Sequence, residues 1–204
     1  MAWNKLKIGL LVTCIALVVA GVLLSPIFFV RPVKGIPKGW SVISGNPDQW
    51  TWSEGKIKGE TQDGESILAS GKEYRDVSIS AVALSTNREA SFVIRAKDAQ
   101  HGYLVAFVPS NTSWLQDTGW IELVRREPNK DVTLASYRGR GMAGSGHSAK
   151  IDITANGPWI EVRLNGVTVI RTKDMTYSKG FIGLRIFGRG NHPCNASYSH
   201  LNFR

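Results

Sequence analysis

The stretch Ala90–Pro109 constrains the fold more than any other part of the sequence, because it has the pattern of two strands joined by a short turn. The first segment would place Phe92, Ile94 and Ala96 on one side of a pleated strand, and Val93 and Arg95 on the other. The second segment, Gly102–Val108, is apolar on both sides, as in a strand that is covered on both faces. The polar connection Lys97–His101 has hairpin length. We therefore expect an antiparallel pair at the centre of an all-β domain.

Short β-like runs separated by turn residues fill the rest of the chain after Val30. They are Trp40–Ile43, Gln49–Ser53, Lys56–Gly59, Ser66–Ala69, Asp76–Leu84, Trp120–Arg126, Val132–Tyr137, Lys150–Thr154, Trp159–Leu164, Val167–Arg171, Phe181–Phe187 and Ala196–Phe203. Asn156-Gly157 and Asn165-Gly166 predict tight hairpins, because both residue types tolerate positive φ. No segment shows sustained helical periodicity, so the pattern indicates a β-sandwich or a barrel.

The uncharged segment Ile8–Val30 has about the ~20 residues that a helix needs to cross a bilayer. A cleaved signal peptide has a shorter apolar core of about 7–15 residues, so we favour an uncleaved anchor over that alternative. The chain then divides into a cytoplasmic N-terminus (1–7), a transmembrane anchor (8–30), a linker (31–38) and a folded domain (39–204). A very short N-terminus usually stays cytoplasmic, which places the C-terminal domain outside the cytoplasm.

The net charge of +9 favours anionic surroundings such as polyanionic glycans, phospholipid head groups or nucleic acid. The basic, Gly-rich stretch Arg138–Lys150 is short and lies inside the predicted domain, so we interpret it as a loop and do not expect a nucleic-acid partner. Cys14 and Cys194 fall in very different segments, and no disulfide is expected between them. The sequence has no phosphate loop or dinucleotide fingerprint, so we expect no cofactor.

A series of short motifs carries a family resemblance through their order along the chain. They are Gly39-Trp40 with Trp50 and Trp52; Ile67-Leu68-Ala69-Ser70 with Tyr74-Arg75-Asp76; Phe92 to Asp98 leading into Gly102-Tyr103; Trp159-Ile160-Glu161-Val162 with Leu164-Asn165-Gly166; and Gly180 to Arg185. Together they span about Gly39 to Arg204 and resemble the concanavalin A-like lectin/glucanase superfamily, most closely its 3-keto-disaccharide hydrolase domain family and laminin G-like relatives. The resemblance implies a jelly-roll sandwich of two antiparallel sheets, whose concave sheet commonly faces a sugar.

The resemblance does not include the catalytic motif of the retaining glucanases. Those enzymes use Glu-x-Asp-x-x-Glu on one strand, and retention requires two carboxylates about 5–5.5 Å apart. The nearest string, Glu60 to Glu65, has the wrong spacing and is predicted to lie in a Gly-containing turn. Glu122 and Glu127 are an odd number of residues apart on one predicted strand and would point to opposite faces. A glucanase mechanism is therefore not expected.

Five residues are candidate ligand contacts: Arg95, Tyr103, Trp114, Trp120 and Arg185. The aromatic rings could stack on sugar rings, and an arginine on a sheet face can donate two hydrogen bonds to vicinal hydroxyls. For both arginines, a structural ion pair or a solvated face is the alternative. We expect Arg95 and Tyr103 to lie close together across the central hairpin, on the sheet that faces the ligand.

Asp98 and His101 are weaker candidates, because they could supply acid–base groups near that face. A solvated charge in a turn is the ordinary interpretation of Asp98. The four histidines are scattered through the chain without close spacing, so no metal site is expected.

We therefore predict a membrane-anchored, extracytoplasmic β-sandwich that binds carbohydrate. The first alternative, which the resemblance implies, is a glycoside hydrolase acting on 3-keto-disaccharides or related glycosides. The second is a non-catalytic protein-interaction module. A shallow aromatic platform would favour the binding protein, a carboxylate with a histidine or metal in a deep groove the enzyme, and a flat, filled sheet the interaction module.

Overall fold

The computed structural model of the protein describes residues 38–85, 89–109, 118–140, 148–190 and 192–204. All of them belong to one compact unit, Arg31–Arg204. The predicted anchor at 8–30, nearly all of the predicted linker and Trp114 lie outside the described residues. Within the described ranges, no helix has the length and apolar character needed to span a membrane.

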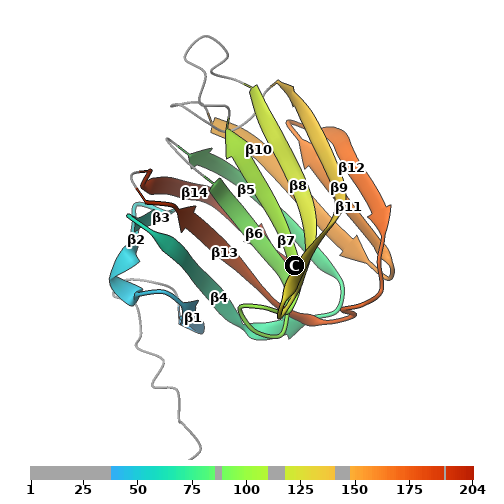
Figure 1. Cartoon of the computed structure of the whole chain (residues 1–204), viewed down its shortest axis with the longest axis horizontal. Coiled ribbons are helices and arrows are strands. Elements are labelled where there is room, and N and C mark those ends of the chain that lie inside the picture. Colours follow the sequence, from blue (N-terminus) through green and yellow to red (C-terminus); the bar gives the residue numbers. More distant parts are fainter. Residues whose placement is uncertain (1–37, 86–88, 110–117, 141–147, 191) are drawn as a thin grey trace, which may run out of the picture. The chain divides into compact units, whose positions relative to one another are not determined.

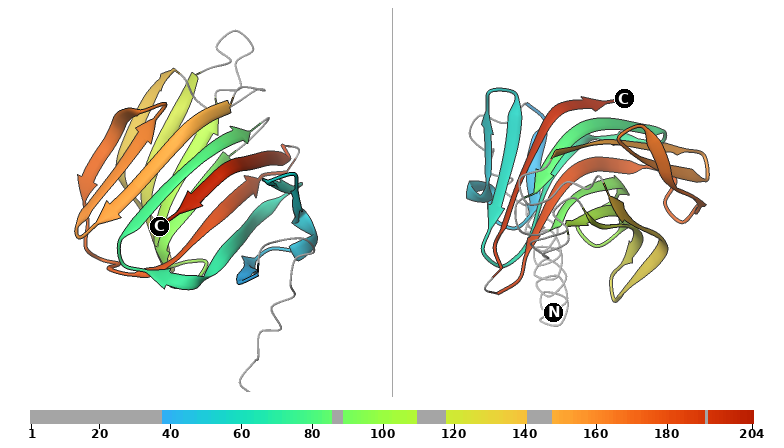
Figure 2. Two further views of the ribbon diagram at one scale, coloured as in Figure 1. Left: turned by 180° about the vertical axis from the view of Figure 1, so that it is seen from behind. Right: turned by 90° about the horizontal axis from the view of Figure 1, so that it is seen from above.

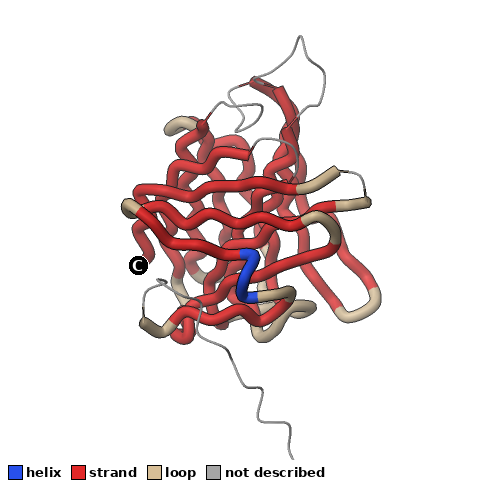
Figure 3. Tube along the Cα trace, turned by 90° about the vertical axis from the view of Figure 1, so that its left-hand side faces the viewer, coloured by secondary structure: helices blue, strands red, loops and turns tan. Residues whose placement is uncertain are grey.

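Two seven-stranded antiparallel sheets form the fold, which is jelly-roll-like as expected (Figure 1). Sheet A consists, in spatial order, of β1 (Trp40–Ser44), β4 (Gly64–Tyr74), β13 (Gly180–Gly188), β6 (Glu89–Ala96), β7 (Gly102–Pro109), β8 (Thr118–Glu127) and β9 (Lys130–Arg140). Sheet B consists of β12 (Val167–Lys173), β11 (Trp159–Leu164), β10 (Ser148–Asn156), β5 (Val77–Ser85), β14 (Cys194–Phe203), β3 (Lys56–Thr61) and β2 (Trp50–Ser53). The helical content of the described residues is the single turn η1 (Pro47–Gln49), drawn blue in Figure 3.

The main core lies between the two sheets and is built by the period-2 alternation of their strands. Phe92 of β6 illustrates its packing, because its ring meets the edges of Phe107 on β7 and Tyr198 on β14, with ring centroids 6.0 and 5.4 Å apart. Every buried side chain of this core belongs to residues 50–198. Residues 50–198 of the described chain therefore supply the buried side chains of a core that spans both sheets.

The central hairpin pairs antiparallel as predicted, and its register places Phe92 opposite Val105 and Ile94 opposite Tyr103. Both faces of β7 are buried, as expected: Tyr103, Val105 and Phe107 join the main core, whereas Leu104 and Ala106 join a second cluster. The members of this second cluster lie on the outer face of sheet A and are Ile67, Val93, Ala96, Leu104, Ala106 and Val124. They are at most 7% exposed although neither sheet covers them. The partly buried side chains of Ile43, Ala99 and Phe181 pack against this cluster.

A β-bulge in β6 changes the predicted orientation of Arg95. Pairing with β13 places Val93 opposite Gly183 but Ala96 opposite Phe181, so β6 contains one extra residue at this point. Arg95 adopts φ +49°, the left-handed region that non-glycine residues seldom occupy. Val93 and Ala96 both contribute to the outer cluster. Arg95 was predicted to share the face of Val93, and the bulge removes it from that face.

Two hairpins of sheet B end in two-residue turns, one at the predicted residues and the other one position later. Asn165 and Gly166 both have positive φ, +50° and +85°, as a type I′ turn requires. In the β10–β11 hairpin, Asn156 pairs with Trp159, so the two turn residues are Gly157 and Pro158, one position later than predicted. Gly157 has φ +52°, which suits the first position of a turn with a leading glycine.

Candidate functional site

The outer face of sheet A curves strongly enough to bring distant strands together. Strands β4 and β8 are separated by three others, about 19 Å in a flat sheet. Arg126 on β8 nevertheless donates a hydrogen bond from Nη1 to Glu65 Oε2 on β4, at 2.9 Å. An arginine and a glutamate cannot together span the flat distance, so this contact requires a concave face, and Figure 2 (right) shows the sheet curving in this way.

At the centre of this concave face, Arg185 of β13 lies between two carboxylates. Its Nε donates to Glu65 and its Nη1 donates to Glu89 on β6. Ser91 adds a further hydrogen bond to Glu89, at 2.8 Å. Only 8% of the Arg185 side chain is exposed. Burial alone would lower its pKa, but the charges of Glu89 and Glu65 raise it, so the guanidinium stays charged.

We name Arg185, Glu65, Glu89 and Arg126 the Arg185 cluster. Its four side chains are 8–19% exposed and form a continuous chain of ion pairs across the sheet. They lie on the face of sheet A that also carries the second apolar cluster, to which Val93 and Leu104 belong. The concave face is therefore a filled, polar surface with fixed donors and acceptors.

Tyr198 fixes the backbone of this cluster from the core side. Its hydroxyl donates to the carbonyl of Arg185 at 2.8 Å and accepts the N–H of Ser91 at 3.1 Å. The ring is fully buried, and burial raises the pKa of its hydroxyl well above the usual value. Because a buried tyrosine holds both strands at the point where the cluster sits, the polar groups are positioned before any ligand arrives.

Aromatic side chains flank the cluster on the same face. Cross-strand partners place Ser91, Ala106 and Glu122 in the row of Arg185, and Trp120 pairs with Arg138 in the next row. Trp120 is half-buried, and the guanidinium carbon of Arg138 lies 5.8 Å from its ring centroid. Phe187, also half-buried, lies beneath the guanidinium of Arg185 at 5.0 Å. The face therefore combines partly accessible rings with charged hydrogen-bonding groups.

Two predicted ligand residues are not accessible on this face. Arg95 is fully buried and donates to the carbonyls of Arg75 at 2.7 Å and Gly157 at 2.8 Å, which joins the β4–β5 and β10–β11 turns. Asp76 lies 3.7 Å from its second terminal nitrogen. The expectation that Arg95 faces a ligand is therefore wrong in this structure, and its structural alternative holds. The physical reason is the bulge, which turns its side chain toward the other sheet.

Tyr103 is likewise fully buried, in the main core rather than on the concave face. Its hydroxyl donates to Asp174 Oδ1 at 2.6 Å, and Asp174 Oδ2 accepts from Arg125 at 2.6 Å. Burial and the hydrogen bond to Asp174 raise the pKa of Tyr103. Burial alone would also raise the pKa of Asp174, but donors from Tyr103, Thr176 and Arg125 outweigh it and hold that pKa at about 2.

Asp98 and His101 lie together in the exposed β6–β7 turn, outside the Arg185 cluster. Asp98 Oδ1 accepts the backbone N–H groups of Gln100 and His101, and its Oδ2 lies 2.7 Å from His101 Nδ1. Burial alone would raise the pKa of Asp98, but these hydrogen bonds lower it. The pair closes the turn in the manner of an Asx turn. Among the described residues, no three His, Cys, Asp or Glu side chains gather to hold a metal ion.

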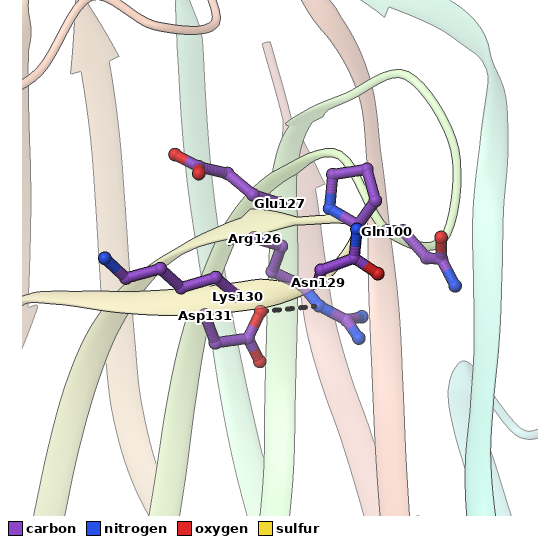
Figure 4. A pocket seen from close by; sticks show the side chains of 7 residues that line it. Gln100, Arg126, Glu127, Asn129, Lys130 and Asp131 are labelled. Carbon is purple, nitrogen blue, oxygen red and sulfur yellow. Dashed lines mark ion pairs between the residues drawn. The ribbon is translucent and has the colours of Figure 1, made fainter.

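A shallow hollow of about 360 Å³ lies beside the β8–β9 turn, next to the concave face. Figure 4 shows that Arg126, paired with Asp131, contributes to its wall. The other lining residues are Gln100, Glu127, Pro128, Asn129 and Lys130. Since Arg126 belongs to both features, the hollow extends the polar surface toward that end of the sheet.

Of the predicted ligand residues, Arg185 and Trp120 lie on the concave face, and Trp114 lies outside the described residues. Sequence reasoning missed Glu65, Glu89 and Arg126. Glu65 was expected in a turn, but β4 begins at Gly64 and places it on the strand. The even spacing of Glu89, Ser91 and Val93 on a strand was the available signal, since it places all three on one face.

The fold is similar to those of three solved structures that are described as carbohydrate-binding proteins or glycosyl hydrolases. They are the carbohydrate binding module CBM66 from Bacillus subtilis (18% identity, TM-score 0.65, covering 81% of this chain and 95% of that chain); a putative glycosyl hydrolase from Parabacteroides distasonis (11%, 0.61, 81% and 88%); and the Emp47p carbohydrate recognition domain (13%, 0.59, 85% and 93%). At these identities the similarity establishes the fold alone.

A family model also matches most of the chain. Residues 35–203 match the 3-keto-alpha-glucoside-1,2-lyase-like domain, which spans both sheets and the whole Arg185 cluster. No curated protein sequence matches the chain.

Proposed function

The chain belongs to the 3-keto-alpha-glucoside-1,2-lyase-like domain family, and from this membership and the concave face we propose that it binds carbohydrate at the Arg185 cluster and the neighbouring Trp120. The observation that carries the proposal is the fixed alternation of acceptor and donor, Glu65, Arg185 and Glu89, on one sheet face. Vicinal sugar hydroxyls donate to carboxylates and accept from guanidinium groups, so they match this pattern.

Charge and exposure in the cluster favour a neutral sugar. Two carboxylates already match the charge of Arg185, and Glu65 also pairs with Arg126, so the centre of the face has no excess of positive charge. Trp120, half-buried beside it, offers an apolar ring face on which a sugar ring can stack. Rigid strands and the hydroxyl of Tyr198 hold the polar groups in place, which lowers the entropy cost of binding.

A glycoside hydrolase acting on 3-keto-disaccharides is the second candidate. Family membership favours it, and so do two carboxylates that flank one guanidinium. A hydrolase of this kind needs a group that donates a proton to the leaving oxygen. Glu65 and Glu89 instead accept hydrogen bonds from Arg185, which suits binding groups, and we therefore rank binding first.

A glycan array probed with Gly35–Arg204, followed by product analysis on each hit, tests the proposal. We expect retention of glycans without turnover. Release of product from a 3-keto-disaccharide by the wild type, lost in Glu89→Gln at unchanged affinity, would establish the hydrolase instead. If the domain neither binds nor cleaves any glycan, the remaining alternative, a protein-interaction module, would be favoured.

We also propose that residues 8–30 anchor the protein in a membrane with the domain on the extracytoplasmic side. Support comes from the length of this segment and its lack of charge. Carbonate extraction tests it, because an anchored chain stays with the membrane pellet. A full-length chain in the soluble fraction, or a mature N-terminus beyond Ser25, would refute the anchor.

A further inference from the structure

One end of the sandwich gathers the start of β1 and several turns; we name it the basal end. It comprises Lys38 and Gly39, the segments 71–76, 97–101, 127–131 and 157–159, and the segment 173–179. Hydrogen bonds hold these parts together: Gly71 N–H to the Gly39 carbonyl, Arg95 to the carbonyls of Arg75 and Gly157, and Asp174 N–H to the Pro158 carbonyl. In Figure 1 the start of β1, the β4–β5 turn and the start of β13 lie at the lower side.

Lysines lie over aromatic rings at three places on the basal end. Lys72 lies 5.2 Å from the ring centroid of Tyr74, Lys97 lies 5.7 Å from that of Tyr177, and Lys173 lies 4.4 Å from that of Trp159. These lysines come from β4, the β6–β7 turn and β12, so the pattern recurs on both sheets. A lysine stem beside an aromatic ring is the pairing found where protein meets the head-group layer of a bilayer.

The charges of the basal end are unbalanced in favour of cations. Each of its acidic side chains is engaged by a protein partner: Glu73 with Lys179, Asp76 with Arg95, Asp98 with His101, Glu127 with Arg125, Asp131 with Arg126, and Asp174 with Arg125 and Tyr103. Six exposed cations at this end form no ion pair within the described residues: Lys38, Lys72, Arg75, Lys97, Lys130 and Lys173.

Exposed apolar side chains accompany these cations. Among the described residues, three large hydrophobic side chains are exposed, and two of them, Trp159 (39%) and Met175 (59%), lie at the basal end. Their neighbours Pro158 and Asp174 are joined by a backbone hydrogen bond of 2.9 Å, so the two residues are close in space. Only the cations would contribute to binding a soluble polyanion, whereas an exposed tryptophan and methionine would also contribute to binding a lipid surface.

We propose that the basal end docks on a membrane surface containing anionic lipids. The six unpaired cations would lie against the head groups, and Trp159 and Met175 would enter the interfacial layer. The described chain also begins at this end, with Lys38. The predicted linker 31–38 reaches at most about 29 Å, so a bilayer holding the predicted anchor would lie within reach of these side chains.

Co-sedimentation of Gly35–Arg204 with vesicles tests this docking, since this fragment contains the complete core and lacks the predicted anchor. We expect it to sediment with vesicles of phosphatidylcholine and phosphatidylglycerol but not with phosphatidylcholine alone. Lys97→Glu with Lys173→Glu should reduce partitioning by at least about 30-fold, because each basic residue near an anionic surface contributes roughly fivefold. The matched control is Lys56→Glu with Lys58→Glu, the same charge change on exposed residues of β3.

A second variant, Trp159→Ala with Met175→Ser, separates a lipid surface from a soluble polyanion. We expect it to weaken sedimentation while melting near the wild-type temperature, because both side chains are exposed. Unchanged sedimentation in this variant would show that the cations alone account for vesicle binding, and would overturn the proposal. Absence of sedimentation by the wild type, or an equal loss in the β3 control, would overturn it too. Glycan binding at the Arg185 cluster should be unaffected in all three variants, so the two proposals fail separately.

Discussion

Asp174 makes the stability of the domain sensitive to acid, and the structure sets the size of the effect. The carboxylate is 10% exposed and accepts hydrogen bonds from Tyr103 and Arg125, both at 2.6 Å, and from the N–H of Thr176. Its pKa is about 2, compared with 3.8 for an ordinary aspartate. One pKa unit corresponds to about 1.4 kcal/mol, so the folded state gains on the order of 2 kcal/mol from the charged form.

The sign follows from the direction of this shift. A lowered pKa in the folded state stabilises the protein above the unfolded-state value of 3.8, and the contribution is lost as the pH falls toward 2. Urea denaturation at several pH values between 5 and 2 measures it, with Asp174→Asn as the reference. The free energy of unfolding of the wild type should fall by about 2 kcal/mol more than that of the variant over this range. Parallel curves for the two proteins would refute the role given to Asp174.

Two further substitutions test the parts of the fold that position the site. Arg95→Met should lower the free energy of unfolding by about 1–3 kcal/mol, because the carbonyls of Arg75 and Gly157 lose the donors that join their two turns; a chemical denaturation curve that matches the wild type would mean that this buried arginine is dispensable. Gly180→Ala should destabilise the domain by about 1–3 kcal/mol, since its Cβ would lie 2.3 Å from the Ala96 carbonyl oxygen between β13 and β6; an unchanged melting temperature would show that the strands separate without cost.

The strands could be predicted because their pattern is local. Alternation of apolar residues identified the central hairpin, which pairs antiparallel, and it predicted that both faces of Gly102–Val108 are covered. Such alternation depends only on the geometry of a pleated strand, so each strand can be recognised without knowing its neighbours.

The orientation of Arg95 could not be predicted in the same way. Simple alternation placed it beside Val93, and one extra residue in the bulge removes it from that face. A non-glycine residue at positive φ carries no signal in the sequence, because tertiary contacts to two distant turns stabilise it. Tyr103 was misplaced for a related reason: its hydroxyl is satisfied in the core by Asp174, 71 residues away.

The candidate site was only partly predictable, because it depends on sheet curvature. Arg185 and Trp120 were recognised from residue type and position. Glu65 and Arg126 form a hydrogen bond only because sheet A bends across the three strands between them. This curvature is a property of the whole sheet. No local pattern around either residue records this contact.

The most direct test of carbohydrate binding on the concave face compares two tryptophans of the same domain. Trp120 lies beside the Arg185 cluster on sheet A, whereas Trp159 is exposed on sheet B and serves as the matched control. Calorimetric titration of a glycan retained on the array should give a Kd that rises roughly tenfold in Trp120→Ala, about 1.4 kcal/mol, and stays unchanged in Trp159→Ala. An unchanged Kd in Trp120→Ala, or an equal rise in both variants, would contradict a binding site on this face.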